Sequence, residues 1–191
     1  MKTNHPILSA AILAIVFASC SEPKAIETSE SVVAEETMEA ATEAESRPSP
    51  LMVKEGQIAG KAIKVQYGSP AVKGRDLWGD LVPYNVVWRT GANEASYVDL
   101  AEDMTVEGKK LEAGKYSLFT IPKETGAWTV IFNSEWDLEH GHFQYDEKND
   151  VLRVDVTPVW EESTQESLSI DIENPGIVIR WEKLKLPITI N

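Results

Sequence analysis

The sequence predicts an all-β protein, an antiparallel β-sandwich that is jelly-roll-like or related. Along the last three quarters of the chain, many short segments alternate apolar and polar residues with a period of two, which is typical of half-buried strands. Glycine, proline and asparagine separate these segments at short intervals, and no segment after Pro48 shows the period of an amphipathic helix. Strands without intervening helices pair antiparallel, so they close as a sandwich or a barrel.

We expect about ten strands in this domain. The clearest alternation covers residues 63–67, 151–156 and 168–172, where apolar side chains occupy every second position. The remaining predicted strands cover 85–89, 96–101, 104–106, 115–121, 127–133, 177–181 and 186–190. The side chains expected to face the interior are Trp88, Leu118, Trp128, Phe132, Val154, Ile170 and Trp181. No internal repeat is visible, which argues against a propeller.

The start of the chain has the pattern of a targeting segment. An apolar run at 7–17, at about 1.5 Å per residue, is too short to cross a bilayer of about 30 Å. It therefore indicates a signal peptide at 1–19. The run ends in the letters FASC, which resemble the lipobox of bacterial lipoproteins, and this resemblance implies lipidation of Cys20. The alternative is an ordinary secretory signal followed by a chance cysteine.

A lipid on Cys20 implies a protein of the cell envelope, anchored to a bacterial membrane on the periplasmic or surface side. Residues 20–47 then form a disordered tether, because the segment 21–47 has eight Glu against two basic residues and no aromatic residue or glycine. Such a segment buries too little apolar surface to offset its ordering entropy. All six Trp and all five Tyr lie beyond it, so the folded domain is expected at 48–191.

The acidic composition argues against several classes of function. The chain has 31 Asp or Glu against 18 Lys or Arg, a net charge of −13, and such a surface repels nucleic-acid phosphates. A single cysteine excludes an intramolecular disulfide and a multi-cysteine metal site. The motifs of serine hydrolases, zinc proteases and phosphate-binding loops are absent, and no cofactor is predicted.

Five short sequence motifs in the predicted domain resemble those of a known family. They are KGR at 73–75, LVPY at 81–84, WRTGANE at 88–94, GKYSLFTIP at 114–122 and DVLRV at 150–154. In this order they resemble a family of bacterial envelope proteins, common among Bacteroidetes, that is defined by a domain of unknown function. The resemblance covers about residues 49–190 and implies no established activity. The chain departs from the family pattern at Ser69-Pro70, where an arginine is expected before the proline.

The densest polar chemistry lies in the first half of the domain, at Lys73, Arg75, Arg89, Asn93 and Glu94. Each cation is near a glycine, which permits a sharp turn and lets a loop present its neighbour. One interpretation is a pocket in which Arg75 and Arg89 hold a carboxylate, a phosphate or a sugar hydroxyl. Glu94 then orients the ligand or acts as a catalytic base.

The other interpretation of these residues is structural, and we give it more weight. Arg89 and Arg153 then fasten long loops to the sandwich by pairing with carboxylates. The candidate partners are Glu94, Asp76 and Asp150. On this interpretation Arg89 is mainly structural, whereas Arg75 is more exposed.

His140 and His142 form a weak candidate metal site. In an extended segment both side chains point to the same side, but Gly141 loosens the spacing, and the nearby residues with ligand character are only acidic. No metal is therefore predicted, and we expect a solvated hairpin loop between residues 133 and 145.

Two functional hypotheses follow. The first is a non-enzymatic envelope lipoprotein whose domain binds a small anionic or sugar-like ligand, or an envelope protein, at the loops of Arg75 and Arg89. The alternative is a hydrolase or lyase that uses Glu94 with Arg89, and with His142 as an additional group. A shared cavity in which Glu94 is unpaired favours the enzyme, whereas pairing and burial favour a structural role.

Overall fold

The computed structural model of this protein describes residues 47–191. The predicted signal peptide, the predicted lipidation site at Cys20 and all but the last residue of the predicted tether lie outside the described residues. Within the described part, no helix is long and apolar enough to span a bilayer.

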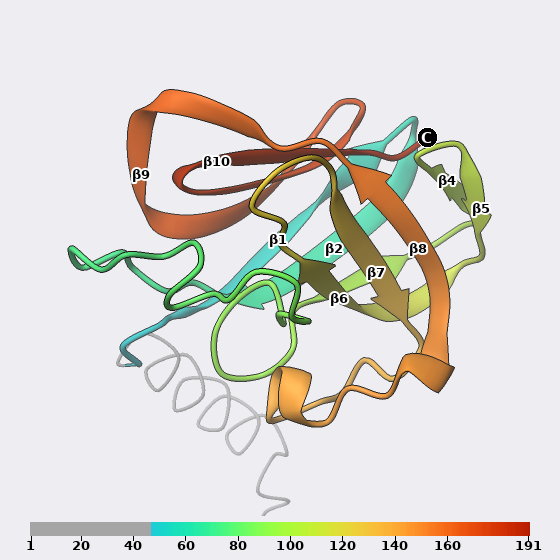
Figure 1. The fold of residues 1–191 in the computed structure, drawn as a ribbon. Coiled ribbons are helices and arrows are strands. Elements are labelled where there is room, and N and C mark those ends of the chain that lie inside the picture. Colours follow the sequence, from blue (N-terminus) through green and yellow to red (C-terminus); the bar gives the residue numbers. More distant parts are fainter. Residues whose placement is uncertain (1–46) are drawn as a thin grey trace, which may run out of the picture. The chain divides into compact units, whose positions relative to one another are not determined.

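Six strands form one antiparallel sheet in the order β1-β2-β3-β6-β7-β8 (Figure 1). Their bounds are Leu51–Ile58 for β1, Lys61–Gly68 for β2, Tyr97–Leu100 for β3, Gly114–Ile121 for β6, Trp128–Asn133 for β7 and Asp150–Val156 for β8. Between β3 and β6 the chain makes a small hairpin of β4, Met104–Val106, and β5, Lys109–Leu111. The sheet is therefore close to a meander, and the long segment between β2 and β3 forms isolated bridges to β6, through Trp88 and Thr120, and to the later strand at Ser167.

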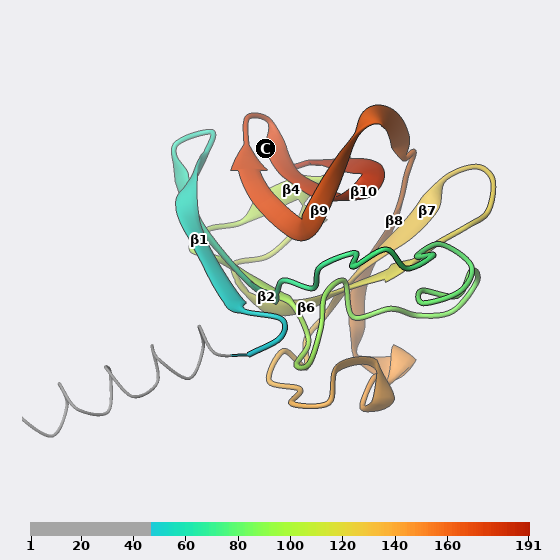
Figure 2. The same ribbon diagram turned by 90° about the vertical axis from the view of Figure 1, so that its left-hand side faces the viewer.

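The second layer is a long hairpin of β9, Val159–Glu173, and β10, Gly176–Thr189. The six-stranded sheet curls, and this hairpin lies across its open side (Figure 2). Apolar residues of both layers join in one core. The predicted all-β fold with antiparallel pairing is thus confirmed, in a sandwich-like arrangement of a large sheet and a two-stranded one.

The predicted core residues are confirmed without exception. Trp88, Leu118, Trp128, Phe132, Val154, Ile170 and Trp181 are all buried in the shared core. Alternation explains this result for the six residues on strands, since every second side chain of a strand points to the same face of its sheet, whereas Trp88 is held by an isolated bridge to Thr120.

Indole rings gather at one end of the core. The rings of Trp78, Trp88, Trp128, Trp160 and Trp181 form six neighbouring pairs with centroids 5.0 to 6.3 Å apart, mostly edge to face. Aromatic pairs in this geometry contribute about 0.5–1.5 kcal/mol beyond their burial. The packed rings therefore support the long segment between β2 and β3, which contacts this cluster.

A smaller apolar cluster lies on the other face of the sheet. Phe119 of β6 and Ile131 of β7 pack there against Ala95 and Leu138. Leu138 belongs to the loop between β7 and β8, which also holds two short 3-10 turns, Gly141–Phe143 and Glu147–Asn149. The expectation of a solvated loop at 133–145 is therefore wrong for its middle, which is anchored on the sheet.

Three strand predictions differ from the structure. Residues 85–89 are not a strand, because only Trp88 pairs with β6, through an isolated bridge to Thr120. The predicted strands at 177–181 and 186–190 are parts of the single strand β10, which is bulged near Glu182. Strands β1 and β5 were not predicted, because β1 mixes glycine and charge and β5 is very short.

Candidate ligand-binding site

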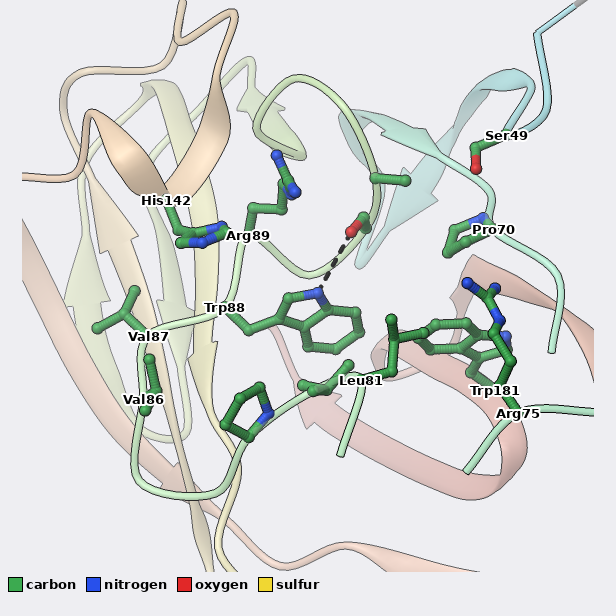
Figure 3. A pocket seen from close by; sticks show the side chains of 14 residues that line it. Ser49, Pro70, Arg75, Leu81, Val86, Val87, Trp88, Arg89, His142 and Trp181 are labelled. Atoms are coloured by element: carbon green, nitrogen blue, oxygen red, sulfur yellow. Dashed lines mark hydrogen bonds between the residues drawn. The ribbon is translucent and has the colours of Figure 1, made fainter. Parts of the chain in front are cut away.

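A cavity of about 410 Å³ opens between the segment that joins β2 to β3, the loop after β7 and the aromatic end of the core. Figure 3 shows Trp88 at its centre, with Arg89 and His142 on one side and Arg75 and Trp181 on the other. The side chains and backbone that line it are Ser49, Pro70, Arg75, Leu81, Val82, Pro83, Val86, Val87, Trp88, Arg89, Gly91, Ala92, His142 and Trp181. The cavity size lies within the usual range for small-molecule sites.

Arg75 is held in place by its own loop. Its Nε donates to the carbonyl of Val72 at 3.0 Å, and its Nη2 donates to the carbonyl of Ala71. Lys73 and Gly74, both with left-handed φ, turn the chain sharply before it. The exposed guanidinium is thereby fixed beside the cavity, and the predicted exposure of Arg75 is confirmed.

Trp88 forms the floor of the cavity. Its backbone exchanges two hydrogen bonds with Thr120 of β6, and its indole N–H donates to the carbonyl of Gly91 at 3.2 Å (Figure 3). The ring stacks on that of Trp181, with centroids 5.8 Å apart and 17° between the planes. These contacts hold the indole at a fixed position under the cavity.

Thr90 holds the backbone next to Arg89 in an unusual conformation. It is fully buried at a φ of +55°, which is uncommon for a β-branched residue and costs about 1–3 kcal/mol. Its hydroxyl contacts that of Thr120 at 3.2 Å, and its carbonyl accepts from the hydroxyl of Ser96 at 2.9 Å. Strain of this kind persists where the surroundings impose it, and it concentrates at binding sites.

Arg89 has no carboxylate partner among residues 47–191. Its Nη1 donates to the carbonyl of Asn93 at 2.6 Å, whereas its Nε is buried and without a partner in the described chain. Burial lowers the pKa of Arg89, and the Glu94 carboxylate partly offsets that effect. The predicted pairing of Arg89 with Glu94 or another acid is therefore wrong, and most of its five N–H donors are free.

His142 lies on the turn at Gly141–Phe143 and also lines the cavity. Burial and then the charge of Arg89 lower the pKa of His142 from its ordinary value, which favours the neutral imidazole. Gly141 makes the approach possible, because it has a φ of +55° and a Cβ there would lie 2.5 Å from Cδ of Arg89. Phe143 follows with its ring on that of His142, at a centroid distance of 4.2 Å.

Three nitrogens of cavity-lining side chains are buried without a hydrogen-bond partner in the described part of the chain. They are Nε of Arg89, Nδ1 of His142 and Nε1 of Trp181. A buried polar group without a partner costs about 1–3 kcal/mol, and such groups are rare in native structures. All three belong to residues that line the same cavity.

The other predicted site residues lie elsewhere. Glu94 accepts two hydrogen bonds from Nη2 of Arg47, at 2.9 and 3.0 Å, and faces a second cavity of about 190 Å³ that Trp136 also lines. Lys73 and Asn93 are exposed and line neither cavity. The structure therefore brings Arg75, Arg89 and His142 together and leaves Lys73, Asn93 and Glu94 outside.

The predicted pairing of Arg153 with Asp150 is present. Nε of Arg153 donates to Oδ2 of Asp150 at 2.6 Å, and its Nη2 donates to the Tyr145 hydroxyl at 2.7 Å. Burial first, and then the Asp150 carboxylate, raise the pKa of Tyr145 to about 12, so the phenol stays protonated and donates to Asp150. This network fastens the start of β8 to the loop before it.

The histidine pair does not form a metal centre in the structure. His140 is exposed, whereas His142 lies beside the Arg89 guanidinium, a neighbour that repels a cation. Within residues 47–191 no group of three or more His, Cys, Asp or Glu side chains is placed to hold a metal ion.

Several cavity residues could not be found by sequence reasoning. Trp181 was expected only in the core, and the apolar residues Leu81 and Val86 belong to a stretch without strand pairing. The one signal in the sequence is that apolar residues and one proline, Pro83, interrupt the polar loop between Trp78 and Trp88.

The fold and the cavity together define an all-β domain with one mixed cationic and apolar pocket between its loops. Residues 49–190 match the family described as "Protein of unknown function (DUF2911)", and the chain belongs to this family. Comparison with curated proteins and with solved structures returns no match.

Proposed function

We propose that this protein is a non-enzymatic binding protein of the cell envelope, and that its DUF2911 domain holds a small anionic ligand in the cavity around Arg89. The observation that carries the proposal is the state of Arg89. Its guanidinium lies half-buried at an apolar cavity with only Nη1 engaged, and no carboxylate of the described residues hydrogen-bonds to it, although the charge of Glu94 acts on it from nearby. A half-buried cation with free donors gains a charge-assisted hydrogen bond from an anion that enters the cavity.

The neighbours of Arg89 support the same ligand charge. Arg75 adds a second positive charge at the cavity, and His142 adds a polar ring nitrogen. None of the lining side chains is a carboxylate or an amide. An anion therefore meets attraction from two guanidinium groups and repulsion from none of the lining side chains, whereas a sugar finds few acceptors for its hydroxyl groups.

The alternative of a hydrolase or lyase has lost its predicted base, Glu94, although the imidazole of His142 still lines the cavity. Glu94 does not line the cavity that holds Arg89, and both of its carboxylate oxygens accept from Arg47. A general base must reach the proton that it removes, and no other acidic side chain lines the Arg89 cavity. The geometry supports binding better than catalysis.

The binding proposal is tested by calorimetric titration of the full chain with butanoate. Arg89→Gln should weaken binding about ten- to a hundredfold, since a charge-assisted hydrogen bond is worth about 1.5–3 kcal/mol. Lys183→Gln is the matched control, because it removes one positive charge from an exposed side chain outside the cavity. Equal affinity of wild type and Arg89→Gln, or no binding of any carboxylate, would falsify the proposal.

The envelope part of the proposal rests on the lipobox-like letters before Cys20 and predicts an acyl anchor there. Cys20→Ser should then move the protein from the membrane fraction to the soluble fraction. If the variant stays with the membranes after a high-salt wash, the lipid anchor is ruled out.

A further inference from the structure

We infer that the ligand of this cavity is an amphiphile, an apolar chain that carries one anionic head group. The inference rests on the proposed function and names the class of ligand. The head group binds at Arg89, and the chain lies over Trp88 and continues to the apolar rim of the cavity. Three features of the cavity support this class over a small polar anion, a dianion or a sugar.

The walls of the cavity are the first feature. Apart from Arg75, Arg89, His142 and Ser49, every lining side chain is apolar or aromatic, or is absent as in Gly91. A small polar anion such as acetate or phosphate needs no such wall. An apolar wall of this kind contributes binding energy only when apolar ligand surface covers it.

The rim of the cavity is the second feature. Leu81 and Val86 line the cavity and are exposed, and Phe143 beside it is 79% exposed. The Phe143 ring lies on His142 and has its centroid 6.0 Å from the Arg89 guanidinium carbon. Single exposed apolar residues are ordinary, but a group of them around the mouth of one cavity marks a surface that apolar material covers.

The arrangement of charge is the third feature. The Arg89 guanidinium carbon lies 6.0 Å from the centroid of the Phe143 ring, and the N–H donors of the group point outward in its plane, as a carboxylate requires. Nε and Nη2 of Arg75 already donate to backbone carbonyls. The charge of Arg75 can therefore attract the ligand, but its engaged donors do not bind a second anionic group. One head group is therefore expected, not two.

The volume sets the length of the chain. At about 30 Å³ per non-hydrogen atom, the liquid volume of one water, the cavity of about 410 Å³ holds roughly a dozen such atoms. Octanoate, with its carboxylate and eight carbon atoms, fits this space. Longer chains reach past it onto the rim.

The test is calorimetric titration of the full chain, carrying Cys20→Ser in detergent-free buffer, with butanoate, hexanoate and octanoate. Affinity should rise up to about fourfold for each added methylene, the factor that about 0.8 kcal/mol per buried methylene gives. Octanedioate, which has the same length with a charge at both ends, should bind more weakly than octanoate. Octylammonium should not bind.

Variants at the rim separate the chain from the head group. Leu81→Ser should weaken octanoate severalfold and leave butanoate unchanged, because Leu81 lies on the other side of Trp88 from Arg89 (Figure 3) and only the longer chain reaches it. Val151→Ser is the matched control, since Val151 is an exposed apolar residue on β8 outside the cavity. Arg89→Gln should weaken all three acids by the same factor.

The outcomes distinguish this inference from the proposed function. If the acids bind through Arg89 with equal affinities, or if octanedioate binds best, the amphiphile is wrong and the anion site stands. If none of the acids binds, both the amphiphile inference and the proposed anion-binding function are wrong. Binding to phosphatidylcholine vesicles that contain oleate, without binding of octanoate in solution, contradicts a free amphiphile and points to a lipid surface.

Discussion

At the scale of single residues, arginines of similar sequence context have different roles in this protein. Arg153 donates hydrogen bonds to the side chains of Asp150 and Tyr145, whereas Arg89 donates one hydrogen bond to a backbone carbonyl. The sequence could not distinguish them, since both follow an apolar run near acidic residues. The difference arises because Glu94, the expected partner of Arg89, pairs with Arg47 instead.

This contrast predicts opposite effects on stability. Arg89→Met should change the free energy of unfolding by less than about 1 kcal/mol, because it breaks one hydrogen bond and leaves no carboxylate uncompensated. Arg153→Met should cost about 2–3 kcal/mol, because it leaves the mostly buried Asp150 carboxylate without its charged donor. Urea unfolding of both variants beside the wild type measures the two values. A loss for Arg89→Met as large as that for Arg153→Met contradicts the binding role of Arg89.

At the scale of elements, alternation and turn residues predicted most strands, and the failures have physical causes. The segment 85–89 looks like a strand because it is apolar, but its apolar residues Val86 and Val87 line a cavity and do not pair with a neighbouring strand. Strand β10 was divided in two because a bulge near Glu182 interrupts the period. No local pattern shows that Trp181 of this strand meets Trp88, since that contact depends on how the two layers pack.

The aromatic end of the core predicts a graded response to mutation. Trp128→Ala should cost about 3–5 kcal/mol, because its side chain is 0% exposed and the cavity left behind is deep in the core. Trp160→Ala should cost clearly less, because that ring is 48% exposed although it touches the same cluster. Guanidinium unfolding midpoints of the two variants provide the comparison. Equal losses would show that the aromatic cluster acts as a unit whatever its burial.

At the scale of the whole molecule, the sheet, the hairpin, the long loop between β2 and β3 and the loop after β7 each contribute one part of the site. The sheet holds Trp88 through Thr120, the hairpin supplies Trp181, and the loop after β7 brings His142 to Arg89. The sequence indicated Arg75 and Arg89 as candidates because cations beside glycines are unusual in an acidic chain. It could not show that the apolar walls and the cations meet, because those residues lie on separate elements.

The central claim, that this cavity is the ligand site, is tested most directly by the indole N–H signals in a nitrogen-15 NMR spectrum. The six Trp report on separate places: Trp88 and Trp181 line the Arg89 cavity, whereas Trp136 lines the smaller one beside Glu94. On addition of octanoate to the Cys20→Ser chain, the signals of Trp88 and Trp181 should shift with the same saturation, and the Trp136 signal should stay. Shifts confined to Trp136, or a spectrum that does not change while octanoate is bound, would contradict the account.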